Sequence, residues 1–444
     1  MLWMCNQKTT NGQSVNDIQH TGPKLQKSMP TQIIKMRMFE FVTTGDISKM
    51  FWQIHMNQED QAYQHTYVIL EKKGKLVEKV MPMMIFGLNS SPFLALATML
   101  QLAKDVEEEF PEAAKLLKHS FYVDDLLQSF PTKEQATEAF RQLKLALKKG
   151  GFQIRKCASN CKEVLRFIDP EDHLTSVVKE IDCSEKEISD VNVLGIKWNR
   201  VDDYLHYTIR PTPLTGAITW RSALSFIAQI FDSPGFLLPV IMTLRIIIQE
   251  ICMKVQSKAG ENETDKQQRK RIWDTPVDEE TSKKFTDCTK DMKVLEQIKI
   301  PRWIKCTDPQ TGDDQLIVFF DASMKAYGFV VYWRHVPFDT NYDVSVTLLG
   351  AGGRVASLAQ KRKEKYNSDE ITLPKNELNS ADEAAKYVKK LKTEIYIPNH
   401  VEIWGFGDST VVNAWFNTPI NKLTVYVANR VRRVLESFEV TKLF

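Results

Sequence analysis

Asp124 and Asp125 are adjacent carboxylates inside the apolar stretch Phe121–Leu127. In a regular strand, neighbouring side chains point to opposite faces, whereas a tight turn lets both acids lie at the tip of a hairpin. A solvated Asp-Asp turn is the ordinary interpretation of such a pair, but an aromatic residue and a valine before it favour a functional hairpin. Clustered carboxylates are the ligands that phosphoryl transfer with two magnesium ions requires.

A third carboxylate, Asp46, ends a strand-like run that begins at Phe39, and the aromatic Phe51 follows five residues later. Phe51 shares a helical spacing with Ile47 and Ile54, which usually marks a core residue. Strand ends hold catalytic carboxylates firmly, because the sheet fixes the backbone there. Asp46, Asp124 and Asp125 are therefore the candidate site of the N-terminal half.

A second set of acids follows the same rule nearer the C-terminus. Asp321 ends the apolar strand expected at Leu316–Phe320, and Asp408 follows the strand expected at Val401–Gly405. Glu377 lies in the first turns of a predicted helix. Asp408 could instead only cap the helix that begins after it, because aspartate accepts hydrogen bonds from free helix N–H groups.

The elements that must position the first set form an α+β pattern. Strands are expected at 67–70, at 77–84 and on both sides of Asp124. Helices are expected at 92–110 and 132–149, the second with Thr132 as its N-cap. The polar segment 6–30 lacks periodicity, which indicates a loop or the remnant of a larger element. A sheet of hairpins backed by helices is the arrangement that this order predicts.

Beyond residue 198 the composition changes. An apolar, helical stretch at 219–251 is broken at 232–235, and a polar, charged segment at 257–271 is typical of an exposed linker. From residue 316 two strands, a loop-rich stretch to residue 373, a helix, a strand and a helix are expected, and this order predicts a smaller α/β domain.

The chain has 444 residues, of which 43% are hydrophobic and 26% charged, and its net charge is +3. At about 150 residues per domain, this length predicts two to four domains. We expect domains at 1–205, 206–310 and 311–444. The composition excludes wholesale disorder, and the near-neutral charge neither requires nor excludes a nucleic-acid partner.

Two features bear on the cellular compartment. Asp232, Pro234 and Arg245 interrupt the apolar stretch Phe226–Ile251, which therefore lacks the about 20 apolar residues of a membrane span. We expect no signal peptide, because the N-terminus lacks a basic segment followed by an apolar one. The seven scattered cysteines are typical of reduced thiols. We expect an intracellular protein, cytoplasmic and particle-associated or nuclear, that is not secreted and has no membrane partner.

The hairpin from Tyr122 to Asp125 strongly resembles the Tyr-x-Asp-Asp palm motif of reverse transcriptases. Further segments resemble the other motifs of that family in the required order, at 45–51, 86–93, 150–156 and 193–198. The details are similar to the Bel/Pao class of LTR retrotransposon polyproteins, in particular at 46–51, 151–156 and 222–232. The resemblance covers the chain from about residue 10 to the last residue.

The resemblance implies a role for each matching residue. Asp46 and Asp124 would ligate both metal ions and Asp125 would assist, with Mg²⁺ as the cofactor and Mn²⁺ as a substitute. Phe51 would exclude a ribose 2′-OH, so that deoxynucleotides are preferred. The other residues on the substrate side would be Phe86, Gly87, Tyr122 and Lys156. Lys156 would protonate or neutralise the leaving pyrophosphate, and a solvated or template-contacting lysine is an equal alternative.

Asp321, Glu377 and Asp408, in the order strand, helix, strand, resemble the acids of ribonuclease H, which also uses two Mg²⁺ ions. That family has a fourth acid after a further strand and helix. Here a helix is expected at 423–436, and the only acid after it is Glu439. We therefore expect a truncated domain that cleaves RNA–DNA hybrids slowly in Mg²⁺ and is partly rescued by Mn²⁺.

The resemblance as a whole implies an α+β reverse transcriptase palm with partial fingers, a helical thumb/connection region and a truncated α/β RNase H-like domain. Its partners would be an RNA template, a DNA primer, an RNA–DNA hybrid, dNTPs and other segments of the same polyprotein. Residues 269–271 and Arg302 are candidate phosphate contacts, with a solvated charge run as the alternative. A second hypothesis is a decayed or domesticated retroelement fragment that binds nucleic acid or protein without catalysis, because most of the fingers are missing.

Overall fold

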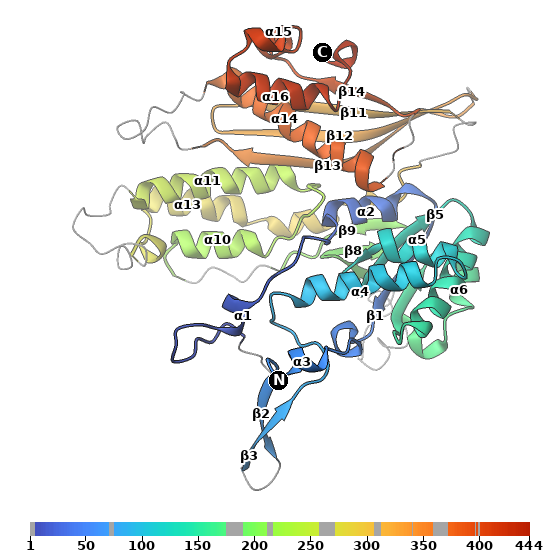
Figure 1. Cartoon of the computed structure of the whole chain (residues 1–444). Helices are drawn as coiled ribbons and strands as arrows, with labels where there is room; N and C mark the ends of the chain where they lie inside the picture. Colours follow the sequence, from blue (N-terminus) through green and yellow to red (C-terminus); the bar gives the residue numbers. More distant parts are fainter. Residues whose placement is uncertain are drawn as a thin grey trace. The chain divides into compact units, whose positions relative to one another are not determined.

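A computed structural model describes residues 5–70, 75–174, 190–210, 216–256, 271–305, 312–339, 341–357, 372–395, 397 and 400–444. The chain divides into two compact units, Met1–Ser189 and Asp190–Phe444 (Figure 1). The second unit contains both the region expected as thumb and connection and the region expected as RNase H-like. The division into three domains at 1–205, 206–310 and 311–444 stays a prediction.

The first unit is built on a four-stranded antiparallel sheet with the strand order β4-β5-β1-β6. Its strands are β1 (Phe41–Ile47), β4 (Phe121–Tyr122), β5 (Asp125–Phe130) and β6 (Ile154–Ser159). The central position of β1 places the carboxyl end of that strand between β5 on one side and β6 on the other.

Three helices contribute most of the core that supports this sheet: α4 (Ser91–Asp105), α5 (Pro111–His119) and α6 (Lys133–Lys149). As expected, Thr132 caps α6, because its side chain accepts a hydrogen bond from Gln135 N at 3.2 Å. The helix expected at 92–110 ends at Asp105, and α5 begins separately at Pro111, since proline is suited to the first position of a helix.

Segment 6–30, in which we expected no regular structure, contains α1 (Val15–Ile18) and the start of α2 (Met29–Met38). Eight of the ten residues of α2 are buried, including Lys35 and Arg37. A helix buried on nearly all sides has no polar face, so it lacks the periodicity by which helices are predicted.

Shorter elements complete the first unit. A two-stranded hairpin, β2 (His65–Leu70) and β3 (Lys75–Val80), occurs where two strands were expected. The others are η1 (Met50–Gln53), α3 (Gln58–Gln61), α7 (Lys162–Leu165) and η2 (Pro170–Asp172).

The second unit opens with a small antiparallel sheet in the order β10-β9-β8-β7. Its strands are β7 (Asp190–Val193), β8 (Ile196–Asn199), β9 (Tyr204–His206) and β10 (Ile300–Pro301). The fully buried Trp198 donates to Asp203 Oδ1 at 3.0 Å. Arg302 is also fully buried and donates to both carboxylate oxygens of Asp203, at 2.6 and 2.8 Å. The expectation that Arg302 contacts phosphate is therefore wrong.

A helical region follows, with α10 (Trp220–Ala228), α11 (Leu238–Gln256), α13 (Glu279–Thr289) and η3 (Met292–Gln297). The expected break at 232–235 is present, and Asp232 accepts hydrogen bonds there from Gly235 N, Phe236 N and Leu237 N. Residues 257–270 of the expected linker, and with them 269 and 270, lie outside the described residues. None of the described helices is long and apolar enough to cross a membrane.

The last part of the second unit is a four-stranded sheet in the order β13-β12-β11-β14. Its strands are β11 (Gly312–Ala322), β12 (Ala326–Pro337), β13 (Ser345–Val355) and β14 (Glu402–Phe406). Only β14 runs parallel to its partner, β11. Strand β13 falls where a loop was expected, since glycines at 350, 352 and 353 weaken its strand signal. A Cβ on Gly350 would lie 2.2 Å from the Tyr387 hydroxyl of the covering helix.

Helix α14 (Leu373–Lys390) packs on β11 and β12, and α16 (Val425–Leu435) packs on α14 (Figure 1). The α16 helix and its buried valines 427, 431 and 434 agree with expectation. The remaining elements are η5 (Leu391–Ile395), α15 (Thr410–Phe416), η6 (Ile420–Lys422) and η7 (Val440–Lys442).

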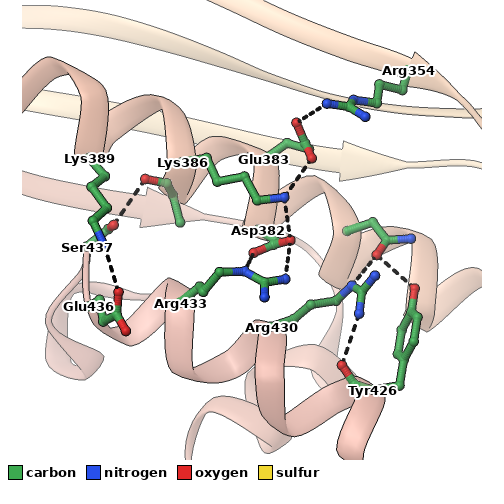
Figure 2. Close-up of polar contacts among 12 residues, drawn as sticks. Arg354, Asp382, Glu383, Lys386, Lys389, Tyr426, Arg430, Arg433, Glu436 and Ser437 are labelled. Carbon is green, nitrogen blue, oxygen red and sulfur yellow. Dashed lines mark hydrogen bonds and ion pairs between the residues drawn. The ribbon is translucent and has the colours of Figure 1, made fainter. Parts of the chain in front are cut away.

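Polar contacts join α14 to α16 (Figure 2). The Asp382 side chain is only 4% exposed. It accepts two hydrogen bonds from Arg433, at 2.6 and 2.8 Å, and forms an ion pair with Lys386 at 2.9 Å. Burial alone would raise the pKa of Asp382, but the two cations outweigh it and lower this pKa. The carboxylate therefore stays charged between the helices.

We predict that Arg433→Met lowers the free energy of unfolding at pH 7 by about 1–3 kcal/mol, because it leaves a buried carboxylate with one partner. The loss should shrink only at a pH well below 4, because the lowered pKa keeps Asp382 charged until then and the protonated acid no longer needs Arg433. Urea unfolding at both pH values measures it. The control Lys389→Met removes an ion pair whose partners are 63% and 47% exposed, and it should change little. Equal effects of the two variants would contradict the prediction.

Candidate functional site

The first three acids meet where β1, β4 and β5 come together. Asp46 of β1 is the direct cross-strand partner of Asp125 in β5, and Tyr122 of β4 is the other partner of Asp125. Directly opposed residues of an antiparallel pair project from the same face of the sheet. Asp124 occupies the turn between β4 and β5, and its carbonyl accepts a hydrogen bond from Ile47 N at 2.9 Å. The structure thus brings Asp46, Asp124 and Asp125 together.

The backbone around this site departs from regular geometry. Val123, in the turn before Asp124, has φ of 56°, which is rare for a β-branched residue. Two residues of β6, Lys156 and Cys157, lie opposite the single Gly45 of β1, which forms a β-bulge. Lys156 itself has φ of 50°. Such departures persist where the surrounding structure enforces them, and they often gather at functional sites.

The bulge explains the position of the Lys156 side chain. Its ammonium group contacts Asp46 Oδ2, and the lysine side chain remains 52% exposed. Among the described residues, Lys156 is therefore the cation that forms an ion pair with Asp46. The family resemblance predicts Lys156 near the leaving pyrophosphate, and its contact with Asp46 is a feature that the sequence does not show.

The three carboxylates repel each other when all are ionised. Burial, together with the charges of Asp124 and Asp46, raises the pKa of Asp125 to about 6, against the opposing effect of Lys156. Burial and the charge of Asp46 also raise the pKa of Asp124. Negative charge is therefore held close together with incomplete neutralisation, which is the environment that a bound cation would relieve.

An aromatic cluster lies on the two segments expected to contact the nucleotide. The rings of Phe51 and Phe86 meet edge to face with centroids 4.7 Å apart, and Trp52 lies 6.3 Å from Phe86. Phe51 also packs against the main core, whereas Phe86 is 48% exposed. Gly87 has φ of 94°, a conformation that favours glycine. Trp52 was not among the residues predicted to contact the nucleotide, although its aromatic side chain directly after Phe51 could have indicated it.

The second acid set gathers at one edge of the β11–β14 sheet. These strands are parallel with Phe319 opposite Phe406, so Asp321 and Asp408 each lie two residues beyond an aligned pair. Glu377 and Asp408 line one cavity together with Phe320, Gly407, Ser409, Val412, Asn413, Phe416 and Phe444. Glu377 Oε2 is buried there with no hydrogen-bond partner. Asp321 is not among the lining residues.

The alternative role for Asp408, capping of α15, is not observed. Ser409 is the N-cap residue, and its hydroxyl accepts the hydrogen bond from Val412 N at 3.4 Å. Glu439 lies outside the cavity lining and forms an ion pair with Lys442 at 3.4 Å. Within the described ranges, no group of three or more His, Cys, Asp or Glu side chains is already arranged to hold a metal ion.

Comparison with known proteins assigns both halves of the chain. Residues 4–188 match the family model described as reverse transcriptase (RNA-dependent DNA polymerase). Residues 219–409 match the model described as Pao retrotransposon-like RNaseH-like domain. The two matches support a Bel/Pao-type reverse transcriptase–RNase H region. Among curated proteins, no match is found. The Pao match begins inside the region expected as thumb and connection and ends just before α15.

Solved structures of foamy viral protease–reverse transcriptases share the fold of this chain. The dRH form with double-stranded DNA is 14% identical at a TM-score of 0.52, covering 97% of this chain and 61% of that one. A complex with RNA/DNA hybrid is 15% identical at a TM-score of 0.51, covering 95% of this chain and 46% of that one. A further complex with double-stranded DNA is 15% identical at a TM-score of 0.52, covering 97% of this chain and 72% of that one. The expected α+β reverse transcriptase architecture with an RNase H-like region is confirmed.

The raised pKa of Asp125 predicts a pH-dependent stability in the presence of a chelator. Because the folded-state pKa of about 6 exceeds the ordinary value, the contribution of Asp125 is full below pH 4 and is lost as the pH rises through 6. Asp125→Asn should therefore be more stable than wild type at pH 7.5, by up to about 3 kcal/mol, and equally stable near pH 4.

Thermal or urea unfolding across this pH range measures the effect. Asp60→Asn, at an exposed position in α3, is the matched control and should follow the wild-type profile. Parallel profiles for wild type and Asp125→Asn would show that the carboxylates are not held in the arrangement described.

Proposed function

We propose that this chain is an RNA-directed DNA polymerase that extends a DNA primer on an RNA or DNA template. The observation that carries the proposal is the register of β1 and β5, which opposes Asp46 to Asp125 and places Asp124 in the adjoining turn. The match of residues 4–188 to the reverse transcriptase family model supports it. The foamy viral relatives of the same fold were solved with double-stranded DNA or an RNA/DNA hybrid, which supports nucleic acid as the partner here.

Divalent metal ions, Mg²⁺ or in its place Mn²⁺, fit the residues present. The donors are carboxylate oxygens, which hard cations prefer, and the pKa values of Asp124 and Asp125 are raised because their charges lack full compensation. Asp46 and Asp124 would hold the ions, with Asp125 assisting. When bound, the ions would neutralise charge on the transferred phosphoryl group and orient it for in-line attack.

Residues of this chain supply the other functions on the substrate side. The Phe51 ring, fixed between the core and Phe86, would exclude a ribose 2′-OH and so select dNTPs. Phe86, Gly87 and Tyr122 would line the nucleotide position. Lys156 would leave Asp46 when metal is bound, and its ammonium group would then neutralise or protonate the leaving pyrophosphate.

We further propose that the second acid set hydrolyses the RNA strand of an RNA–DNA hybrid. The supporting observation is Glu377 Oε2, a buried acceptor without a partner that shares a cavity with Asp408. Metal-bound water or metal itself would satisfy this oxygen, because buried acceptors rarely stay unpaired. Asp321, at the aligned end of the neighbouring strand, would complete the set.

For the polymerase, we predict that Asp124→Asn lowers the primer extension rate by on the order of 100-fold or more, because metal charge compensation is lost. Extension of a DNA primer on poly(rA) in Mg²⁺, and again in Mn²⁺, measures it. Duplex binding by fluorescence anisotropy should be unchanged or stronger, since one negative charge is removed. Asp60→Asn, at the exposed α3 position, should extend like wild type.

Two results would count against this assignment. Equal extension by wild type and Asp124→Asn would remove Asp124 from catalysis. Duplex binding by the wild type without any extension in either metal would instead favour a retroelement fragment that binds nucleic acid without catalysis.

For hybrid cleavage, we predict that Asp408→Asn abolishes the activity in both Mg²⁺ and Mn²⁺ while primer extension is retained. Asp124→Asn should show the converse, because the two acid sets lie in different units. The control Glu439→Gln removes an acid outside the cavity lining and should cleave like the wild type. A gel assay of a labelled hybrid measures all three, and full cleavage by Asp408→Asn would refute the second site.

A further inference from the structure

The N-terminal segment Cys5–Gly22 runs alongside the loop that contains Phe86 and Gly87. The contacts follow the same order along both segments. They join Cys5 Sγ to Phe86 O at 4.0 Å, Asn16 to Gly87 O and Asn89 N at 2.8 and 2.9 Å, and Ser90 Oγ to Gln19 Oε1 at 3.3 Å. At the end of this row, Gly22 lies so close to the Phe93 ring that a Cβ would come within 2.4 Å of it.

Asn16 is the most constrained residue of this contact. It is 7% exposed, and its amide group donates to Gly87 O and to Asn6 Oδ1, each at 2.8 Å. Its side-chain oxygen accepts from Asn89 N at 2.9 Å, and its backbone carbonyl accepts from Asn89 Nδ2 at 3.2 Å. Both amide hydrogens and the oxygen of the side chain are thus engaged, which fixes its orientation.

A small apolar cluster reinforces the same contact. Cys5, Ile85 and Leu88 are buried together, with Val15 and Met81 packed against them, and this cluster is separate from the main core of the unit. The loop that contains Phe86 and Gly87 is therefore anchored on both sides by residues of the N-terminal segment. Its position depends on that segment as well as on the sheet.

We infer that Asn16 is a positioning residue for the incoming nucleotide, an inference that rests on the proposed polymerase function. Asn16 holds the carbonyl of Gly87 and the N–H of Asn89, and so sets the backbone from which Phe86 projects. The Phe86 ring in turn supports the Phe51 ring at 4.7 Å. Loss of the Asn16 contacts therefore alters both the loop at the nucleotide position and the support of the Phe51 ring, which selects the sugar.

The expected effect is on nucleotide binding and not on chemistry. Asn16→Ala should raise KM for dTTP by about tenfold, the scale of lost buried hydrogen bonds, with kcat changed by no more than about twofold. Incorporation of UTP relative to dTTP should increase, because the Phe51 ring loses its support. Asn16→Asp keeps the size and the acceptor for Asn89 N but loses both donor bonds, to Gly87 O and to Asn6 Oδ1, and opposes a negative charge to these oxygens, so it releases the loop without creating a cavity.

The experiment uses the full chain with a DNA primer on poly(rA). Steady-state kinetics with dTTP and UTP are measured for wild type, Asn16→Ala, Asn16→Asp and the control Thr9→Ala. Within the described residues the Thr9 side chain bonds only to Asn11 and Gln13, so its loss should leave KM unchanged. Hydrogen–deuterium exchange of residues 85–93 reports the position of the loop independently of activity.

The inference is supported if both Asn16 variants raise KM and loop exchange while Thr9→Ala does neither. Increased loop exchange with unchanged KM, or a fall in kcat alone, would overturn the positioning role and leave the polymerase assignment intact. Unchanged loop exchange in both Asn16 variants would overturn it as well. Wild type that shows no Asp124-dependent extension would overturn the proposed function itself and this inference with it.

Discussion

The mutual repulsion of three carboxylates is the constraint on which the first unit depends. Asp46, Asp124 and Asp125 are held together although burial and like charges raise the pKa of two of them. Only a rigid scaffold can hold such an arrangement, and here the register of β1 with β5 provides it. The large apolar core beneath the sheet offsets the electrostatic cost, since core burial is the main source of folding free energy.

The irregular features of the unit can be understood from this constraint. The β6 bulge directs Lys156 toward Asp46, so that a protein cation partly balances the acids before any other cation binds. The left-handed Val123 turns the chain tightly enough for Asp124 to stand beside Asp125. Strain and repulsion are thus located at the same place, as expected of a site whose geometry serves chemistry and not stability.

In the second unit, two parallel strands and a helix position the acids. Parallel pairing of β11 with β14 aligns the strand ends that precede Asp321 and Asp408, and α14 adds Glu377 from the face that it covers. The ion pairs of Asp382 with Arg433 and Lys386 hold α14 to α16. Helix packing therefore controls where the third acid of the set lies, and the sheet controls the other two.

Sequence alone determined which residues are the candidates for the chemistry, because apolar strands that end in acids are local patterns. It also predicted local features such as the Thr132 cap and the break at 232–235, since both depend on near neighbours. Tertiary structure decided the partners. Lys156 lies against Asp46, Arg302 is buried by Asp203, and Asn16 holds Gly87, across 110, 99 and 71 residues respectively. A local pattern shows which face of an element is buried, but long-range pairing decides what that face meets.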